Sequence, residues 1–272
     1  MKFSEYYTDK NEFVFIDDIR AGDEPWSALD SVEKMVDDFV CAKRGSLPGD
    51  FEKFLFFNSA PMPDGESEDR SIMIMRTAYA HAPVCDSDLK IYIGPGTILE
   101  TGAVIKGPCV IGERCEIRHG AYIRGGVIVG DSCVIGHATE VKNSIIMDHS
   151  NAGHFNYLGD SVVGSYCNLG AGTVLANLKF RGREELLSGT IKNISTTSHT
   201  GEMIRTGRNK LGAVIGDFTE IGCNTVVVPG ALVGSDCWIY PNTTVNRGVY
   251  PPASVIRNKG AMEMETVKRK SL

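Results

Sequence analysis

Three cationic residues recur at an interval of 18 residues, and a histidine follows shortly after the last of them. The cations are Lys106, Arg124 and Lys142, and the histidine is His154. Lysine and arginine side chains bind phosphate oxygens through charge-assisted hydrogen bonds. A histidine titrates near neutral pH and can take a proton from an attacking nucleophile. These residue types could bind a phosphate and activate a nucleophile, provided that the fold brings them together.

A six-residue repeat surrounds these residues and must position them. An aliphatic residue occupies every sixth position from Ile93 to Val141, and a small residue follows four positions later from Thr97 to Thr139. An α-helix has a period near 3.6 and a strand a period of 2, so a period of six fits neither alone. The pattern indicates a parallel β-helix, in which short strands meet at corners and the aliphatic residue fills the interior.

The cations follow three of these aliphatic residues directly, which predicts that they form a column. If one coil holds 18 residues, Lys106, Arg124 and Lys142 lie above one another, about 4.8 Å apart. Like charges that close repel unless something neutralises them. A local carboxylate such as Glu140 could do so, and so could an anionic ligand such as phosphate. A solvated charged edge is a third interpretation, and the pattern leaves all three open.

The repeat is interrupted twice, and we interpret both interruptions as functional. It slips after Val141 and returns at Val163, and the polar residues around His154 lie between. Natural proteins tend to break local rules where function requires it, so we expect this segment to replace the regular coil. A second excursion is expected at residues 181–211, because long loops in compact proteins are usually functional or disordered.

The chain outside the repeat predicts a domain organisation. Residues 1–88 are expected to form an α-containing region that caps the end of the solenoid, because apolar residues follow Asp23-Glu24-Pro25 at helical spacing. The β-helix is expected at residues 89–257 and a mobile tail at 258–272.

Composition excludes several classes of function. The net charge of −6 and the pI near 5.6 argue against a general nucleic-acid binder. The N-terminus does not resemble a signal peptide, and no apolar stretch is long enough to span a membrane, so we expect a cytoplasmic protein. The cysteines show no CxxC spacing and are expected to be structural. Those at the small position of the repeat are Cys109, Cys115, Cys133, Cys167 and Cys237.

Residues 90–257 resemble a family of known enzymes. The sequence resembles the hexapeptide-repeat acyltransferases, and in particular the acetyltransferase domain of the archaeal-type bifunctional glucosamine-1-phosphate acetyltransferase / N-acetylglucosamine-1-phosphate uridylyltransferase family. The matching sequences are Glu140-Val-Lys-Asn, Asn151-Ala-Gly-His-Phe-Asn-Tyr-Leu-Gly-Asp160, Asn168-Leu-Gly-Ala-Gly-Thr173, Asn177 and Thr206-Gly-Arg-Asn-Lys-Leu-Gly-Ala-Val-Ile-Gly-Asp217. The resemblance implies a left-handed parallel β-helix, an all-β fold with a small α-containing N-terminal region, that assembles as a homotrimer.

The resemblance also implies a reaction and its residues. It implies acetyl transfer from acetyl-CoA to the amino group of a sugar phosphate such as glucosamine-1-phosphate, with His154 as general base and no metal. It implies that substrate is bound by Arg124, Lys142, Tyr157, Asn168 and Lys210. It implies that acetyl-CoA contacts Ala171, Asn177, Cys223 and Arg257.

The chain departs from the family's pattern, and rival interpretations remain. It shows no glycine-rich nucleotidyltransferase loop, so we expect no uridylyl transfer. The family's aromatic residue after the CoA-side asparagine is Leu178 here, and its serine is Cys223, which puts the acyl group in doubt. One rival is a zinc enzyme resembling the γ-type carbonic anhydrases, suggested by the spacing of His149 and His154. Others are a non-catalytic scaffold and acyl transfer to another amino-sugar or nucleotide-sugar acceptor.

Overall fold

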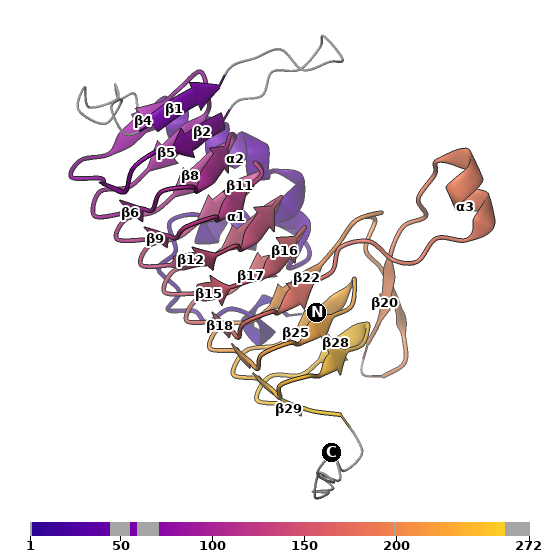
Figure 1. The fold of residues 1–272 in the computed structure, drawn as a ribbon. Helices are drawn as coiled ribbons and strands as arrows, with labels where there is room; N and C mark the ends of the chain where they lie inside the picture. The colour runs from indigo at the N-terminus through magenta and orange to yellow at the C-terminus, as the bar shows by residue number, and fades with distance from the viewer. Residues whose placement is uncertain (1, 44–54, 59–70, 199, 259–272) are drawn as a thin grey trace, which may run out of the picture.

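Short strands wind into a long solenoid with three faces, as the computed structural model shows (Figure 1). The structure describes residues 2–43, 55–58, 71–198 and 200–258. The expected tail from residue 259 onward therefore lies outside the described residues. The fold class predicted from the repeat and the resemblance, a left-handed parallel β-helix with a small α-containing N-terminal region, is confirmed.

Each face is one sheet, and the chain visits the three sheets in turn. The first sheet holds β1 (Leu55–Asn58), β2 (Ser71–Ile74), β7 (Val104–Lys106), β10 (Tyr122–Ile123), β13 (Glu140–Lys142), β16 (Tyr157–Gly159), β19 (Val174–Leu175), β24 (Val226–Val227) and β27 (Thr244–Val245). The second holds β4 (Val84–Asp86), β5 (Ile91–Ile93), β8 (Cys109–Ile111), β11 (Val127–Val129), β14 (Ser144–Ile146), β17 (Val162–Val163), β22 (Ala213–Ile215), β25 (Ala231–Val233) and β28 (Gly248–Tyr250). The third holds β3 (Ala78–Tyr79), β6 (Ile98–Leu99), β9 (Glu116–Ile117), β12 (Val134–His137), β15 (Asn151–His154), β18 (Asn168–Leu169), β23 (Glu220–Ile221), β26 (Trp238–Ile239) and β29 (Val255–Ile256).

The aliphatic residues of the repeat fill the interior, as predicted. The residues from Ile93 to Val141 at six-residue spacing are all buried, and they belong to one continuous core. The cysteines at the small position are buried beside them, and the thiols of Cys115 and Cys133 contact backbone carbonyls of the next coil. Burial raises the pKa of the Cys167 thiol to about 12, which keeps it protonated and unreactive. The structural interpretation of these cysteines is confirmed.

The register slip after Val141 is not a break in the coil, and this corrects our prediction. The interior continues through Ile146, Ala152 and Leu158 to Val163, and their strands pair in register with the coils on either side. Two of the steps span five residues instead of six, because the corners that follow Lys142 and Gly159 are each one residue shorter. The polar segment is therefore an ordinary coil with tight corners.

Antiparallel strands cover the N-terminal end of the solenoid. β2, β3 and β4 pair antiparallel with β7, β6 and β5. Their apolar residues, including Ile72, Ile74 and Val84, belong to the interior core. Residues 71–86, which we expected in the N-terminal region, thus contribute a strand to each sheet and close the core at this end.

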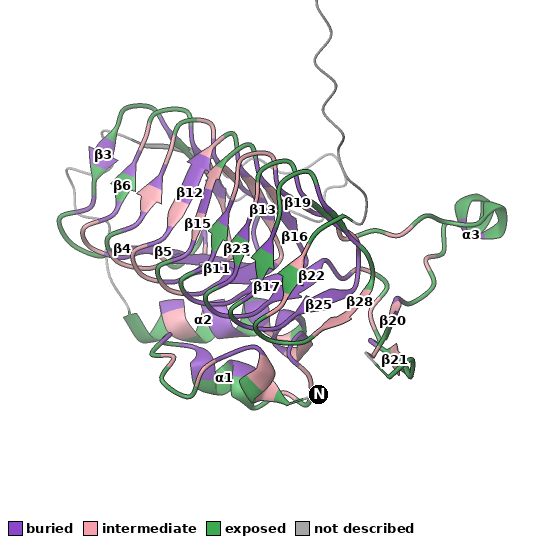
Figure 2. Ribbon diagram, turned by 90° about the horizontal axis from the view of Figure 1, so that it is seen from below, coloured by how far each residue is buried: buried purple, intermediate pink, exposed green. Residues whose placement is uncertain are grey.

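The N-terminal helices lie along the side of the solenoid rather than on its end, in contrast to our expectation. They are η1 (Phe3–Glu5), α1 (Ile16–Arg20), η2 (Ser27–Asp30) and α2 (Val32–Lys43). Figure 2 shows them beneath the second sheet. Val36 and Val40 of α2 share a second core with outward residues of that sheet, such as Val110 and Ile128. An exposed row of such apolar residues would be unfavourable, so the helices cover the second sheet.

The chain leaves the coil between β19 and β22. This excursion contains α3 (Arg183–Ser188) and a hairpin of β20 (Ser195–Thr197) and β21 (Met203–Arg205). α3 projects away from the solenoid (Figure 1), while the hairpin lies near its C-terminal coils. Among the described helices, none has the length and apolarity to cross a membrane.

Candidate functional site

The three cations form one column on the outer face of the first sheet. Ile105, Ile123 and Val141 pair in register across β7, β10 and β13, and a cation follows each of them. Since residues alternate between the two faces of a strand, the cations point outward when the aliphatic residues point inward. The predicted column is therefore confirmed.

Local groups stabilise the first part of this column. The Arg124 guanidinium donates a hydrogen bond of 2.7 Å to the Glu140 carboxylate, and this bond raises the pKa of Arg124. The Lys106 ammonium and the Arg124 guanidinium lie 6.0 and 5.8 Å from the centre of the Tyr122 ring, within cation–π range. The local-carboxylate interpretation therefore holds for Arg124. Lys142, in contrast, makes no ion pair with any residue that the structure describes.

Tyr157 lies beside Lys142 on the same face. Glu140 pairs with Tyr157 and Lys142 with Gly159, so the tyrosine and the lysine occupy neighbouring positions on adjacent coils. The Tyr157 hydroxyl extends over Gly159, where an added Cβ would be only 2.6 Å from it. Burial raises the pKa of Tyr157, with further contributions from Glu140 and Asp160. The hydroxyl therefore stays protonated at neutral pH and can donate a hydrogen bond to a ligand.

A polar ladder follows at the corner between the first and second sheets. Asn143, Asp160 and Asn177 occupy equivalent positions in three successive coils. The two asparagine amides donate to opposite oxygens of the Asp160 carboxylate, at 2.7 and 2.6 Å. Asn143 and Asp160 have positive φ angles, which the tight corners require and which asparagine and aspartate adopt more readily than most residues. Asp160 is buried, so the ladder positions Asn177 firmly.

Arg208 connects this ladder to the N-terminal helices. One end of its guanidinium lies 3.8 Å from Asp160, and the other contacts Asp30 of η2. Its Nε donates to the backbone carbonyl of Lys210, and Leu211 donates to the carbonyl of Asn177. The returning end of the excursion is thus placed beside Asn177. The structure therefore places the Lys210 backbone at the Asn177 corner.

Sequence reasoning did not select Asp160, Asn143 or Arg208 as site residues. Asp160 appeared only as the last residue of the matched motif, and Arg208 only within the sequence that precedes Ile-Gly-Asp. A signal was present, because Asn143, Asp160 and Asn177 are spaced by 17 and 17 residues. That spacing is informative only once the coil is known to hold 17 residues here.

His154 lies at the next corner, between the third and first sheets. It ends β15, pairs with His137 of the previous coil, and exposes its side chain. The backbone carbonyl of His154 accepts a hydrogen bond from the Gly172 amide in the next coil. In the same way, the carbonyl of Ala171 accepts a hydrogen bond from the Asn224 amide one coil further on. His154, Ala171 and Cys223 therefore occupy one column at successive coils, about 4.8 Å apart. The expected base and two expected acetyl-CoA contacts share one edge.

Asn168 and Arg257 lie apart from the cation column. Asn168 begins β18 on the outer face of the third sheet, where its amide donates to Glu220 at 3.0 Å. With Cys223 and Trp238 it lines an open hollow of about 410 Å³. Arg257 follows β29, four coils beyond β15 in the third sheet. Within one chain, neither residue reaches the cations, and both lie on the side of Ala171 and Cys223.

Within one chain, the histidines of the zinc interpretation do not converge. His149 precedes β15 and His154 ends it, at opposite corners of the third sheet, so the His-x4-His spacing does not bring the two rings of one chain together. His149 stacks on Tyr166 instead, with ring centres 4.5 Å apart. His119 and His137 do stack, at 5.5 Å, and each directs its Nδ1 to a backbone carbonyl. Across the described residues, no group of three or more histidine, cysteine or acidic side chains is arranged to hold a metal.

Comparisons with known proteins match the same part of the chain. Residues 105–191 match the family described as the GMPPB C-terminal domain. A stretch of 104 residues is 40% identical to the bifunctional sugar-1-phosphate nucleotidylyltransferase/acetyltransferase of Sulfurisphaera tokodaii, covering 38% of this chain and 23% of that protein. A stretch of the same length is 33% identical to the bifunctional protein GlmU of Methanocaldococcus jannaschii, with the same coverage. The resemblance to the GlmU acetyltransferase domain is confirmed.

The chain spans less than a quarter of the length of these relatives. Among solved structures, the UDP-N-acetylglucosamine acyltransferase of Francisella novicida matches 61% of this chain and 57% of its own, at 16% identity and a TM-score of 0.32.

The site residues form two neighbouring groups. The cation column and Tyr157 lie on the outer face of the first sheet, with Asn177 and the Lys210 backbone at the corner towards the second sheet. His154, Ala171 and Cys223 line the corner between the third and first sheets.

Proposed function

We propose that this protein transfers an acetyl group from acetyl-CoA to the amino group of a sugar phosphate, with glucosamine-1-phosphate as the first acceptor to test. One observation carries the proposal: Lys142 and Tyr157 share the outer face of the first sheet, one corner away from the exposed His154. A cation without a carboxylate partner among the described residues suits a phosphate, and the histidine suits the amine of the same small molecule. The matched relative from Sulfurisphaera tokodaii carries acetyltransferase in its name, which supports this proposal.

In the proposed mechanism, binding precedes proton transfer. Arg124, Lys142 and Lys210 bind the phosphate, and Tyr157 and Asn168 orient the sugar. The unprotonated amine attacks the thioester carbonyl, so that an N–C bond forms. His154 takes the proton from the nitrogen as the tetrahedral adduct collapses, the C–S bond breaks, and the CoA thiolate leaves. Positioning of the two substrates supplies much of the rate enhancement.

Acetyl-CoA is proposed to lie along the corner column of Ala171 and Cys223. From His154, this column continues past the hollow beside Trp238, towards Arg257. Asn177 would approach acetyl-CoA from the neighbouring corner. Because the two corners are separated by the width of the first sheet, we propose that a homotrimer completes the site, with Asn168 and Arg257 facing a neighbouring subunit. A cytoplasmic location, where acetyl-CoA is available, is part of this proposal.

The test is a thiol-release assay with acetyl-CoA and glucosamine-1-phosphate. We expect turnover by the wild type and a loss of at least about 100-fold in His154→Ala, the range that general-base catalysis contributes. The matched control is His137→Ala, which removes a histidine from the same column one coil earlier and should retain activity. Equal losses in the two variants would contradict the role of His154.

The same assay distinguishes the acceptor. Absence of thiol release with glucosamine-1-phosphate, followed by release with another amino-sugar phosphate or a nucleotide-linked amino sugar, would retain the acetyltransferase and correct the substrate. Absence of release with all three classes would overturn the proposal. Molar mass measured by light scattering tests the trimer independently, because a monomeric active enzyme would require a site within one chain.

A further inference from the structure

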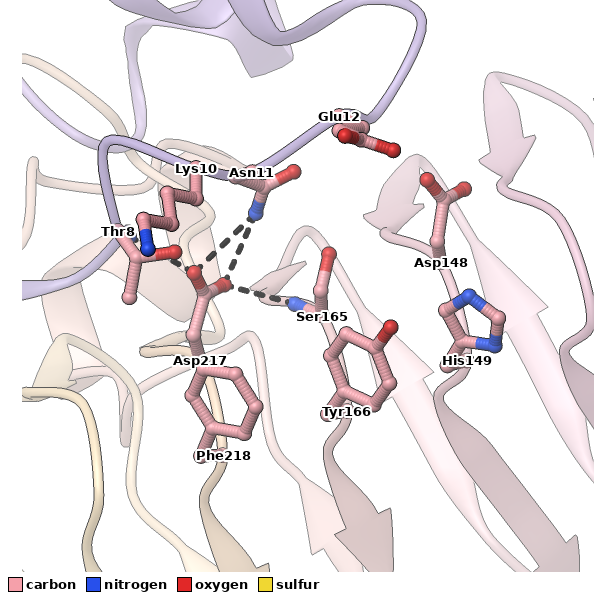
Figure 3. Close-up of a pocket in the computed structure, with 10 residues that line it drawn as sticks. All are labelled: Thr8, Lys10, Asn11, Glu12, Asp148, His149, Ser165, Tyr166, Asp217 and Phe218. Atoms are coloured by element: carbon pink, nitrogen blue, oxygen red, sulfur yellow. Dashed lines mark hydrogen bonds between the residues drawn. The ribbon is translucent and has the colours of Figure 1, made fainter.

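A second pocket lies at the corner between the second and third sheets, away from the candidate active site. Its volume is about 420 Å³, and it is lined by Thr8, Lys10, Asn11, Glu12, Asp148, His149, Ser165, Tyr166, Asp217 and Phe218. The N-terminal segment forms one wall and the corner of the solenoid forms the other (Figure 3). None of these residues belongs to the site proposed for acetyl transfer.

The N-terminal wall is fixed in place by one buried carboxylate. Asp217 accepts hydrogen bonds from the Thr8 amide at 2.8 Å, from the Asn11 side chain at 3.1 Å, and from the Ser165 amide at 2.8 Å. Both oxygens of this carboxylate accept hydrogen bonds, and these bonds fix the distance between the N-terminal segment and the corner of the solenoid. The pocket is therefore a built feature of the fold rather than a gap beside a loose segment.

The opposite wall carries a stack of three aromatic rings. His149, Tyr166 and Phe218 occupy equivalent corner positions of successive coils, with ring centres 4.5 and 5.1 Å apart and nearly parallel planes. The ring faces stack on one another, so the ring edges and the Tyr166 hydroxyl point towards the pocket (Figure 3). This wall offers apolar contact together with one hydroxyl.

Ser165 supplies the observation that indicates a ligand. Only 5% of its surface is exposed, and its hydroxyl oxygen is buried without a hydrogen-bond partner among the described residues. Figure 3 shows this hydroxyl directed into the pocket, on the side of Glu12 and Asp148. An unsatisfied buried hydroxyl costs free energy that a bound polar group would recover.

The charge around the pocket is negative. Asp148 uses one carboxylate oxygen to accept the Asp131 amide at 2.7 Å, and burial raises its pKa. Glu12 makes no ion pair with any described residue, and Figure 3 shows its carboxylate directed towards Asp148. Lys10 lies at the Thr8 end of the pocket, away from both. Arg114 acts on Asp148 from outside the pocket, where it pairs with Asp131. Two facing carboxylates that make no ion pair with a described residue favour a positively charged ligand.

We propose that this pocket binds the primary ammonium group of a small hydroxylated molecule. The ammonium would lie between Asp148 and Glu12, and a ligand hydroxyl would pair with Ser165 and Tyr166. A metal ion fits less well, because the described residues hold no cluster of three or more metal ligands. The inference does not depend on the proposed acetyl transfer, since the two sites share no residue.

Isothermal titration of the whole protein with D-glucosamine tests this proposal, in an amine-free buffer at a pH below the pKa of the ligand's amine. We expect binding to the wild type, and weakening of about tenfold in Ser165→Ala and more in Asp148→Asn, because the hydrogen bonds involve a charged partner or a buried group. Ser165→Ala should not destabilise the fold, because its hydroxyl has no hydrogen-bond partner in the part of the chain that the structure describes.

Controls separate this pocket from the active site and from nonspecific binding. Ser235→Ala removes a buried serine from the equivalent corner position outside the pocket and should bind like the wild type. His154→Ala should also bind normally. N-acetyl-D-glucosamine, which lacks the charge, should bind at least about tenfold more weakly. Absence of binding, equal effects of the two serine variants, or equal affinity for the acetylated sugar would each overturn the proposal.

Discussion

At the scale of single residues, the candidate site depends on how closely side chains pack over glycine. Tyr157 and Asn177 meet above Gly159, where no side chain fits beneath them. Their polar ends are the groups that would contact substrates, whereas the interior of the coil at this point is formed by Leu158. The side chains that would contact substrates therefore lie outside the core at this position, although Asn177 is also bonded to Asp160.

Gly159→Ala should impair activity strongly and should lower stability less than Asp160→Ala, because it disturbs only one of the two hydrogen bonds to Asp160. The added Cβ would lie 2.6 Å from the Tyr157 hydroxyl and 2.7 Å from the Asn177 amide, so both side chains must move. We expect kcat/KM to fall by about tenfold or more, since small displacements of positioning residues are costly. The control is Gly153→Ala in β15, where no atom lies within 4 Å of the added Cβ. A comparable loss of kcat/KM in both variants would show that alanine disturbs the strand backbone rather than the Tyr157 and Asn177 side chains.

Asp160→Ala should damage both stability and the site. Removing the carboxylate leaves the amides of Asn143 and Asn177 without their acceptor at a buried corner. The expected loss is about 2–4 kcal/mol in the free energy of unfolding, from two unsatisfied donors. Urea denaturation measures it. Asp160→Asn should lose less, because its amide oxygen still accepts one bond, and an equal loss would argue against the ladder.

At the scale of elements, the N-terminal segment is attached to the solenoid through Asp217. Burial raises the pKa of this carboxyl, although its hydrogen bonds from Thr8, Ser165 and Asn11 oppose that effect. A carboxyl whose folded-state pKa lies above its unfolded value contributes stability at low pH and loses it as pH rises through the folded pKa. The free energy of unfolding should therefore be lower when Asp217 is ionised than when it is protonated.

A variant tests the sign of this linkage. Asp217→Asn removes the titration, so the stability of the wild type relative to the variant should fall as pH rises through the raised pKa of Asp217. Urea denaturation at several pH values on either side of the ordinary aspartate pKa measures the difference. If the wild type gains stability relative to the variant as pH rises, the carboxylate is stabilised in the folded state and the predicted direction is wrong.

At the scale of the whole molecule, the N-terminal helices cover the outer face of the second sheet, and no described helix covers the other two. Ile128 of β11 has 0% exposure because the helices cover it, whereas Val134 of β12 lies on the outer face of the third sheet. Ile128→Asp should lower the free energy of unfolding by several kcal/mol, since it buries an unpaired charge. Val134→Asp should change it by about 1 kcal/mol or less. Thermal and urea denaturation of the two variants compare them.

The sequence by itself determined the solenoid, because a six-residue period with an aliphatic interior position is compatible with few other folds. It also determined the cation column, since residues one coil apart must lie above one another. These predictions needed only periodicity and strand geometry.

Tertiary structure decided the rest. The shorter coil after Val141 moved Asn143, Asp160 and Asn177 into one column, and a fixed period of six could not reveal a corner lacking one residue. The position of the helices followed from apolar residues on the outside of the second sheet, which the interior repeat does not describe. Contacts such as Arg208 with Asp30 join residues 178 positions apart, and local pattern carries no information at that separation. Local periodicity specifies a repeating scaffold, whereas packing between distant segments specifies the site built on it.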